Sequence, residues 1–172
     1  MNKARVVIGA ALALAVGFCG TGAWTYARAR GDDSLAYGRA RDEALADGRA
    51  ALTVLTSLDA STRQRAQAGI RDWGAASTGP LRDELARTAP KAGASARGTV
   101  TEAAVTALDT HSGTAKLITT VRVDVTPAGT KTPTTDRKRL EAVLERTGAG
   151  QWKVRALDAV PVAGAAQEDD GR

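Results

Sequence analysis

The sequence is poor in the side chains that most catalytic and metal sites need. Its 172 residues include one cysteine, Cys19, and one histidine, His111. No Cys and His residues have the spacing of a metal site, no glycine-rich loop follows a strand as in a phosphate cradle, and no serine lies in a nucleophile elbow. The sequence therefore predicts no catalytic residue, no metal and no bound cofactor.

Aromatic residues are also scarce, and acidic residues are missing from the first 31 positions. Three of the six aromatic residues lie before residue 28, which leaves too few for a surface that stacks on nucleic-acid bases. The part after residue 27 carries 22 Lys and Arg against 19 Asp and Glu, a mild basic excess. Nucleic-acid binding requires basic residues clustered on one face, so we expect no nucleic-acid partner.

The sequence does contain an uncharged run from Val6 to Ala27, with basic residues on both sides. As a helix this run would be about 33 Å long, enough to cross a hydrocarbon layer of roughly 30 Å. We expect a cytoplasmic stub at 1–5, a single transmembrane helix at 6–27 and a hinge at 28–33. The anchor depends on apolar side chains and on aromatics suited to the headgroup boundary: Val6, Ile8, Leu12, Leu14, Val16, Phe18, Trp24 and Tyr26.

A cleaved signal peptide is the alternative interpretation of this run, because Thr21 and Ala23, or Ala27 and Ala29, could place small residues at a cleavage site. The run is longer than the usual apolar core of about 7 to 15 residues, which favours an anchor. A charged stub before an apolar core is typical of exported chains. We therefore expect a single-pass protein of the cell membrane, with a cytoplasmic N-terminus and an extracytoplasmic C-terminal domain.

Small residues recur at every fourth position of the run and form a possible face for packing against another membrane helix. They are Gly9, Ala13, Gly17 and Thr21. In a segment this rich in alanine and glycine, the same spacing also arises by chance.

Helical periodicity dominates residues 34–90, and Ser34 is suited to capping the first helix. Apolar residues at helical spacing form one stripe: Ala44, Leu45, Ala51, Leu52, Leu55 and Leu58. Charged residues, Asp47 among them, are predicted to lie on the opposite side. A second helix is expected at 63–73, and a third begins near Pro80, because proline fits the first helical turn.

Residues 99–160 change to the alternation that is typical of strands. Runs rich in Thr, Val and Ala at 99–109 and 114–126 are separated by turn residues, and two more strands follow, the last at 152–160. Three helices followed by four antiparallel strands predict an α+β domain over residues 34–162, with the helices on one face of the sheet. The small, acidic tail at 163–172 is expected to be disordered.

Two short motifs carry a family resemblance: a Thr-Gly-x-Leu/Phe-Arg-x-Glu helix start and a closing Gly-x-Trp-x-Val hairpin. In this chain they comprise Thr78, Gly79, Leu81, Arg82, Glu84, Gly150, Trp152 and Val154. Together with the single span and the long helix, they resemble the Mce-associated membrane proteins of actinobacteria. The resemblance implies a cone-shaped, nuclear transport factor 2-like (cystatin-like) domain with a curved four-stranded sheet. It also implies an accessory role beside Mce lipid-import complexes.

The polar residues of the domain have ordinary structural explanations. His111 lies in the expected turn at 109–113, where a lone histidine is exposed and solvated. Asp124, Glu141 and Glu145 lie among the polar residues that alternate with apolar ones along their strands. These carboxylates would line a pocket if they lay on the concave face of the sheet. We favour the alternative, in which they lie on the face exposed to water. The basic run 137–139 either meets anionic lipid headgroups or protects an edge strand from aggregation, and we favour the edge strand.

Two functions from different classes follow from the sequence. The first is a non-enzymatic, membrane-anchored accessory or scaffold protein of the cell envelope. It would support an Mce-type lipid or sterol import complex through protein contacts. The second is an exported cone domain that binds or transforms a small hydrophobic molecule between its helices and its sheet. The first interpretation is favoured, because the domain lacks a catalytic set.

Overall fold

A computed structural model of the chain describes residues 33–160. The chain divides into two compact units, residues 1–40 and 41–172; the packing described below is that of the second unit, and the first helix, 33–55, begins in the first unit. The predicted stub, the predicted anchor at 6–27 and the acidic tail lie outside the described residues. Within 33–160, no helix combines the length and the apolar character needed to cross a bilayer.

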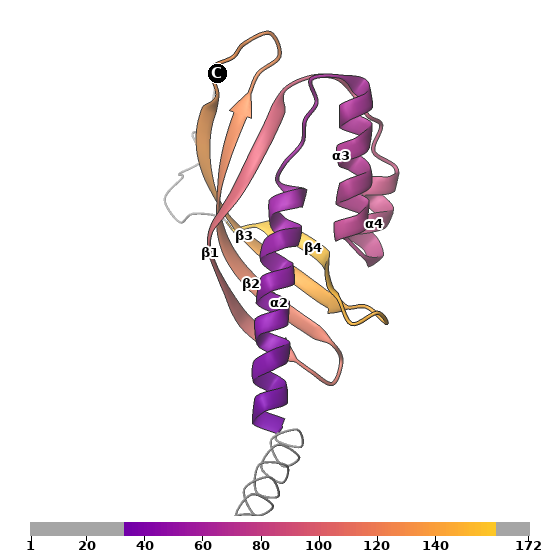
Figure 1. The fold of residues 1–172 in the computed structure, drawn as a ribbon, viewed down its shortest axis with the longest axis vertical. Helices are drawn as coiled ribbons and strands as arrows, with labels where there is room; N and C mark the ends of the chain where they lie inside the picture. Colours follow the sequence, from indigo (N-terminus) through magenta and orange to yellow (C-terminus); the bar gives the residue numbers. More distant parts are fainter. Residues whose placement is uncertain (1–32, 161–172) are drawn as a thin grey trace, which may run out of the picture. The chain divides into compact units, whose positions relative to one another are not determined.

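Within the described residues, three helices precede the sheet, in the order expected from the sequence (Figure 1). They are α2 (Asp33–Leu55), α3 (Arg63–Ala76) and α4 (Gly79–Ala86). Because α2 already includes Asp33, Ser34 is not its N-cap, and that prediction is wrong. The next two helices have threonine at the N-cap: the Thr62 hydroxyl accepts the Arg65 N–H at 3.2 Å at the start of α3, and the extended Thr78 precedes α4 without a side-chain cap hydrogen bond.

Helix α3 continues three residues past the predicted end at 73, because Gly74 adopts helical geometry instead of ending the helix. Ser77 ends it in an extended conformation, and its hydroxyl donates to the Trp73 carbonyl at 2.8 Å. The indole N–H of Trp73 donates to the carbonyls of Val54, at 2.9 Å, and Ser57, at 2.8 Å. This side chain therefore ties α3 to the end of α2.

Four strands form one antiparallel sheet in the order β1-β2-β3-β4, which confirms the predicted α+β class. They are β1 (Ser95–Asp109), β2 (Thr114–Thr126), β3 (Thr134–Arg146) and β4 (Trp152–Ala159). Strand β1 begins four residues before the predicted start at 99. The early residues lack β-branched side chains, but Ala96 pairs with Val125 and also exchanges two 2.8 Å backbone hydrogen bonds with Leu58. Long-range pairing therefore outweighs local propensity.

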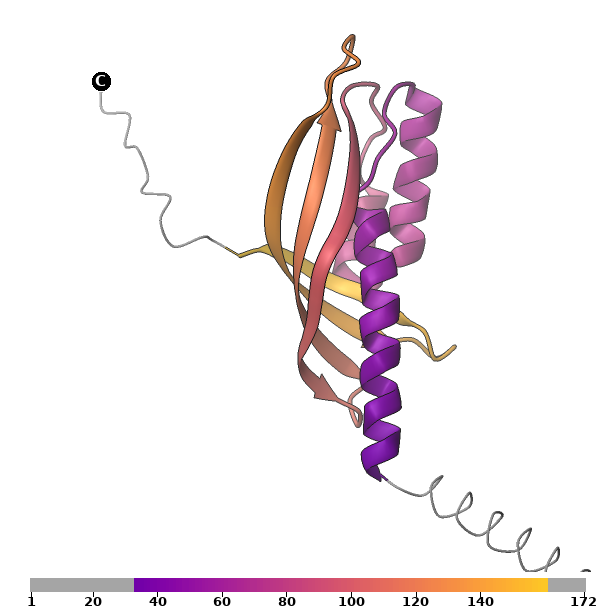
Figure 2. The same cartoon turned by 60° about the vertical axis from the view of Figure 1, so that its left-hand side comes forward.

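The core lies between α2 and the sheet, as Figure 2 shows from the side. In β2 the residues with odd numbers, Leu117 and Val121 among them, face the helices, while Arg122 and Asp124 face the other way, as the alternation predicted. The largest fully buried apolar side chains are Leu52, Leu117, Val121, Leu144 and Val154. They come from one helix and three strands, so the core joins these elements.

Helix α2 lies close to the sheet at Gly48. A Cβ atom at this position would lie 2.5 Å from Leu117 Cδ2 and 2.9 Å from Leu144 Cδ1. The buried face of α2 includes Ala44, Ala51 and Leu52, which confirms the centre of the predicted stripe. The prediction was wrong at its end, because α2 stops at Leu55 and Leu58 lies beyond it.

The helices α3 and α4 stand beside β4 (Figures 1 and 2). Ser77 forms an isolated parallel bridge with Val154, and the Thr78 N–H donates to the Val154 carbonyl at 2.8 Å. The segment between the two helices therefore covers part of the outer edge of β4. This cover satisfies a backbone group that an edge strand would otherwise leave unpaired.

Candidate functional site

The two family motifs meet in space at β4. The helix-start motif contributes Thr78, whose N–H bonds to the carbonyl of Val154 in the closing motif. Gly79 and Gly150 both have positive φ angles, +54° and +85°, which are accessible to glycine at little cost. Leu81 is half-buried, whereas Arg82 and Glu84 are exposed. The motif residues thus build one corner of the domain, where α4 joins the closing hairpin.

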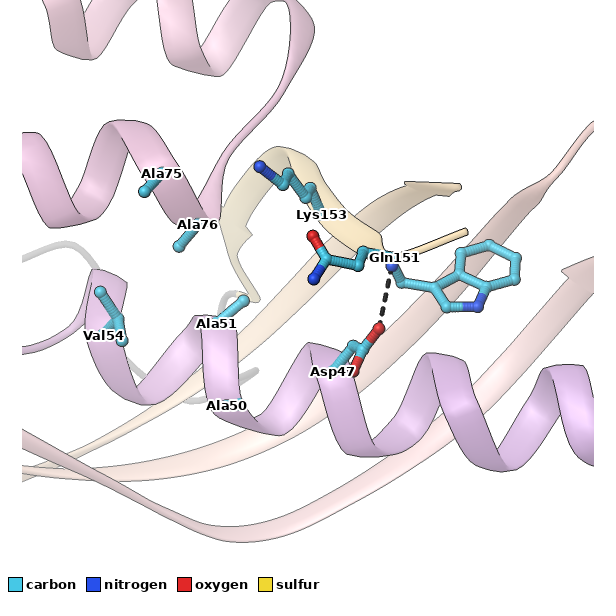
Figure 3. Close-up of a pocket in the computed structure, with 9 residues that line it drawn as sticks. Asp47, Ala50, Ala51, Val54, Ala75, Ala76, Gln151 and Lys153 are labelled. Carbon is cyan, nitrogen blue, oxygen red and sulfur yellow. Dashed lines mark hydrogen bonds between the residues drawn. The ribbon is translucent and has the colours of Figure 1, made fainter. Parts of the chain in front are cut away.

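Trp152 is the largest side chain of this corner, and it is 3% exposed. Its backbone N–H donates to the carboxylate of Asp47 at 3.0 Å (Figure 3). The sequence placed Asp47 on the polar side of α2, and this prediction was wrong. Asp47 lies three residues after Ala44 and four before Ala51, so it shares their face. Its carboxylate acts as a hydrogen-bond acceptor between α2 and β4.

A small pocket of about 240 Å³ lies beside this hydrogen bond, between α2, the end of α3 and β4 (Figure 3). Alanine is the commonest residue of its lining, with Val54 at one side and Lys153 extending toward Ala75. The indole N–H of Trp152 is buried and has no hydrogen-bond partner within residues 33–160. The pocket is smaller than the range of about 300 to 1,000 Å³ that is usual for ligand sites.

A larger cavity of about 650 Å³ lies between α3, α4 and β4, and we call it the α3–α4 groove. Three basic residues from three elements line it: Arg71 of α3, Arg82 of α4 and Lys153 of β4. The rest of its wall is formed by apolar residues, chiefly Ile70, Ala75, Ala86 and Pro90, and by the polar residues Gln67 and Thr88. Its volume falls within the usual range of ligand sites.

The candidate carboxylates of the sheet lie on the face that points away from the core beneath α2. Each forms an ion pair there: Asp124 with Arg122 at 3.5 Å, Glu141 with Lys116 at 3.8 Å and Glu145 with Arg155 at 3.2 Å. None of the three carboxylates is buried. This position agrees with the expectation of charges that face water.

His111 lies at the exposed tip of the hairpin between β1 and β2, as predicted. Its backbone N–H and that of Ser112 donate to the Asp109 carboxylate, at 2.8 and 3.1 Å. The Ser112 hydrogen bonds and then that of His111 hold the pKa of Asp109 below its usual value. These contacts close the turn, so Asp109 has a structural role there.

The basic run at 137–139 lies on an open strand edge. Strand β3 pairs with β2 from Thr134 onward, but its pairing with β4 begins only at Leu140. Five residues of β3, 134–138, therefore have a sheet neighbour on one side only. This position supports the interpretation that the charges protect an edge strand.

The α3–α4 groove was not predicted from the sequence. Arg82 was identified as part of a motif, but Arg71 and Lys153 carried no local signal that separates them from other surface cations. The three meet only because α4 folds back beside β4. Asp47, by contrast, could have been found, because its spacing to Ala44 and Ala51 places it on the apolar face of α2.

Among solved structures, the chain is similar to one described as "Ntf2 like protein involved in plasmid conjugation". The two share 13% identity with a TM-score of 0.48, over 74% of this chain. This chain spans about half, 51%, of that protein's chain. No protein-family model matches this chain, and no curated protein matches it.

Proposed function

We propose that this chain is a non-enzymatic, membrane-anchored accessory protein of the cell envelope with a nuclear transport factor 2-like domain. In this proposal the run 6–27 is a single-pass anchor, the N-terminus is cytoplasmic and the domain is extracytoplasmic. The domain supports an Mce-type lipid or sterol import complex through protein contacts. The apolar run and the resemblance carried by the motifs at Thr78 and Gly150 support this assignment.

The observation that carries the proposal is the close packing of α2 against strands β2 and β3. Leu52, Leu117 and Leu144 are fully buried there, and even a methyl group at Gly48 would overlap the two sheet leucines. A domain packed in this way offers a partner its surfaces, not its interior. The proposal therefore assigns the function to the outer faces of the sheet and helices.

The sheet provides one such surface. Its outer face carries basic and acidic side chains in ion pairs, and the edge of β3 at 134–138 has no strand neighbour on the β4 side. Polar surfaces of this kind fit reversible contact with another protein, whose charges set the orientation of docking.

Purification in a mild detergent tests this proposal. We expect partner membrane proteins to co-purify with the full chain in stoichiometric amounts and to be identified by mass spectrometry. Recovery of the chain as a monomer without companions would contradict the proposal.

The alternative is an exported cone domain that binds or transforms a small hydrophobic molecule between helices and sheet. It requires room at the place where Leu52, Leu117 and Leu144 are packed together. Saturable binding of an uncharged hydrophobic probe would favour this alternative if substitutions in that layer abolished it.

A further inference from the structure

Three basic side chains from distant parts of the sequence converge on the α3–α4 groove. Arg71 comes from the middle of α3, Arg82 from the first half of α4 and Lys153 from the start of β4. They are held there by elements that are fixed to one another through the Thr78 N–H to Val154 carbonyl bond. The groove is therefore a defined feature of the fold, although its cations are carried on long side chains.

The cations of the groove form no ion pair within the described residues, although Glu145 lies opposite Lys153 in the register of β3 and β4. The ion pairs of residues 33–160 engage six other basic residues, and none involves Arg71, Arg82 or Lys153. Within residues 33–160, no Asp or Glu lines the groove. Unpaired cations around a hollow attract an anion, and guanidinium groups bind carboxylate and phosphate oxygens with two parallel hydrogen bonds.

The remaining wall of the groove is largely apolar, and Gln67 and Thr88 are its polar members. Ile70 and Pro90 are half-buried, and Ala75 and Ala86 add methyl groups to the same wall. Gly74 leaves the wall open, because a Cβ atom there would meet no other atom within 4 Å. A simple inorganic ion would leave this apolar surface uncovered, whereas a ligand with a hydrocarbon part would cover it.

We propose that the α3–α4 groove binds a small amphiphilic organic anion. Its phosphate or carboxylate lies among Arg71, Arg82 and Lys153, and its apolar part lies on Ile70, Ala86 and Pro90. The site differs from the sheet surfaces that the proposed accessory role uses. The result of the partner co-purification experiment therefore does not decide whether the groove binds an anion.

Calorimetric titration of the full chain in phosphatidylcholine nanodiscs, with hexyl phosphate as the probe, tests this proposal. We expect saturable binding that weakens as ionic strength rises, because salt screens exposed charges. Inorganic phosphate lacks the apolar part and hexanol lacks the charge, so both are expected to bind at least about tenfold more weakly.

Variants locate the binding. Arg71→Gln, Arg82→Gln and Lys153→Gln are each expected to weaken hexyl phosphate binding by about tenfold or more, since each removes a charge-assisted hydrogen bond. Arg137→Gln removes the same charge from an exposed position of β3 and is expected to change the affinity by less than about twofold. Gly74→Leu keeps all three cations but fills the groove, and it is expected to abolish binding. Circular dichroism checks that each variant remains folded.

The proposal is overturned if hexyl phosphate does not bind, or if it binds the Arg71 and Arg82 variants as tightly as the wild-type chain. Equal affinity for inorganic phosphate or for hexanol would also overturn it. So would binding only to anionic lipid vesicles with none to free hexyl phosphate, because that result assigns the cations to a membrane surface.

Discussion

A single glycine determines how closely α2 approaches the sheet. Gly48 is buried against Leu117 and Leu144, and the side chains of both leucines are fully buried. We expect Gly48→Val to lower the free energy of unfolding by about 1 to 3 kcal/mol, because the added atoms overfill a packed core. Urea unfolding of the full chain measures this change. Gly74→Ala is the control; it has open space and is expected to be neutral or to stabilise by up to about 1 kcal/mol. A neutral Gly48→Val would contradict the close approach.

Asp47 joins α2 to the closing hairpin through the Trp152 N–H. We expect Asp47→Ala to destabilise the domain by about 1 to 3 kcal/mol, since it leaves a partly buried donor without its acceptor. Asp47→Asn retains an acceptor oxygen and should lose less. Urea unfolding compares the two variants, and equal losses would show that the hydrogen bond is not the cause.

Asp59 connects α2 to α3 and accepts hydrogen bonds from the Ser61 hydroxyl at 2.6 Å, the Ser61 N–H at 3.0 Å and Arg65 at 2.8 Å. These contacts lower its pKa from 3.8 to about 2. Because the folded-state pKa is lowered, the stabilising contribution is complete above pH 3.8 and is lost as the pH falls toward 2.

NMR titration of the Asp59 carboxyl carbon tests this pH dependence. Ser61→Ala is expected to raise the pKa of Asp59 toward 3.8, because the Ser61 hydroxyl is the largest cause of the shift. Ser112→Ala lies on a different turn and should leave Asp59 unchanged. An Asp59 pKa near 3.8 in the wild-type chain would refute the interpretation.

The sequence predicted correctly which residues are buried where an element has one buried and one exposed face. The alternation in β2 placed Leu117 and Val121 inside correctly, because a strand has only two faces. The prediction for α2 failed at Asp47. It placed this residue on the outer face because aspartate is polar, although its spacing to Ala44 and Ala51 puts it on the buried face, where its carboxylate bonds to β4. Of the groove, only Arg82 was noticed in the sequence.

At the scale of elements, β3 combines a paired half with an open edge. Residues 134–138 have no neighbour on the β4 side, and Arg137 and Lys138 are exposed there. Such an edge can pair with another chain, and charge opposes this pairing. We expect Arg137→Gln, Lys138→Gln and Arg139→Gln together to increase self-association, measured by sedimentation velocity. Removing three charges elsewhere, at Arg63, Arg87 and Lys91, is the matched control. Equal self-association of the two triple variants would show that net charge alone is responsible.

Most elements were predictable from local pattern. Strand β2 was predicted with its observed ends, 114 and 126, because β-branched residues fill it and turn residues bound it. The start of β1 was missed, since Ala96 and Gly98 join the sheet through Val125, Val123 and Leu58 and not through their own propensity. The α3–α4 groove also escaped prediction, because it arises from packing between elements.

At the scale of the whole molecule, the proposal combines two parts of the chain. The run 6–27 supplies the anchor, and the packed domain supplies surfaces for contact. A soluble domain of this kind would meet partners at random, whereas a tethered one has a high effective concentration near membrane partners. In this proposal, tethering allows polar surfaces that bind only weakly to contact a membrane partner often enough for an accessory role.

Crosslinking of alkaline-washed membranes, followed by mass spectrometry of the full chain and its neighbours, tests this central claim most directly. We expect the chain to remain in the washed membrane with its N-terminus intact and to form crosslinks from the sheet face to subunits of a lipid-import assembly. Recovery of a shortened, soluble chain that crosslinks to no membrane protein would contradict the claim.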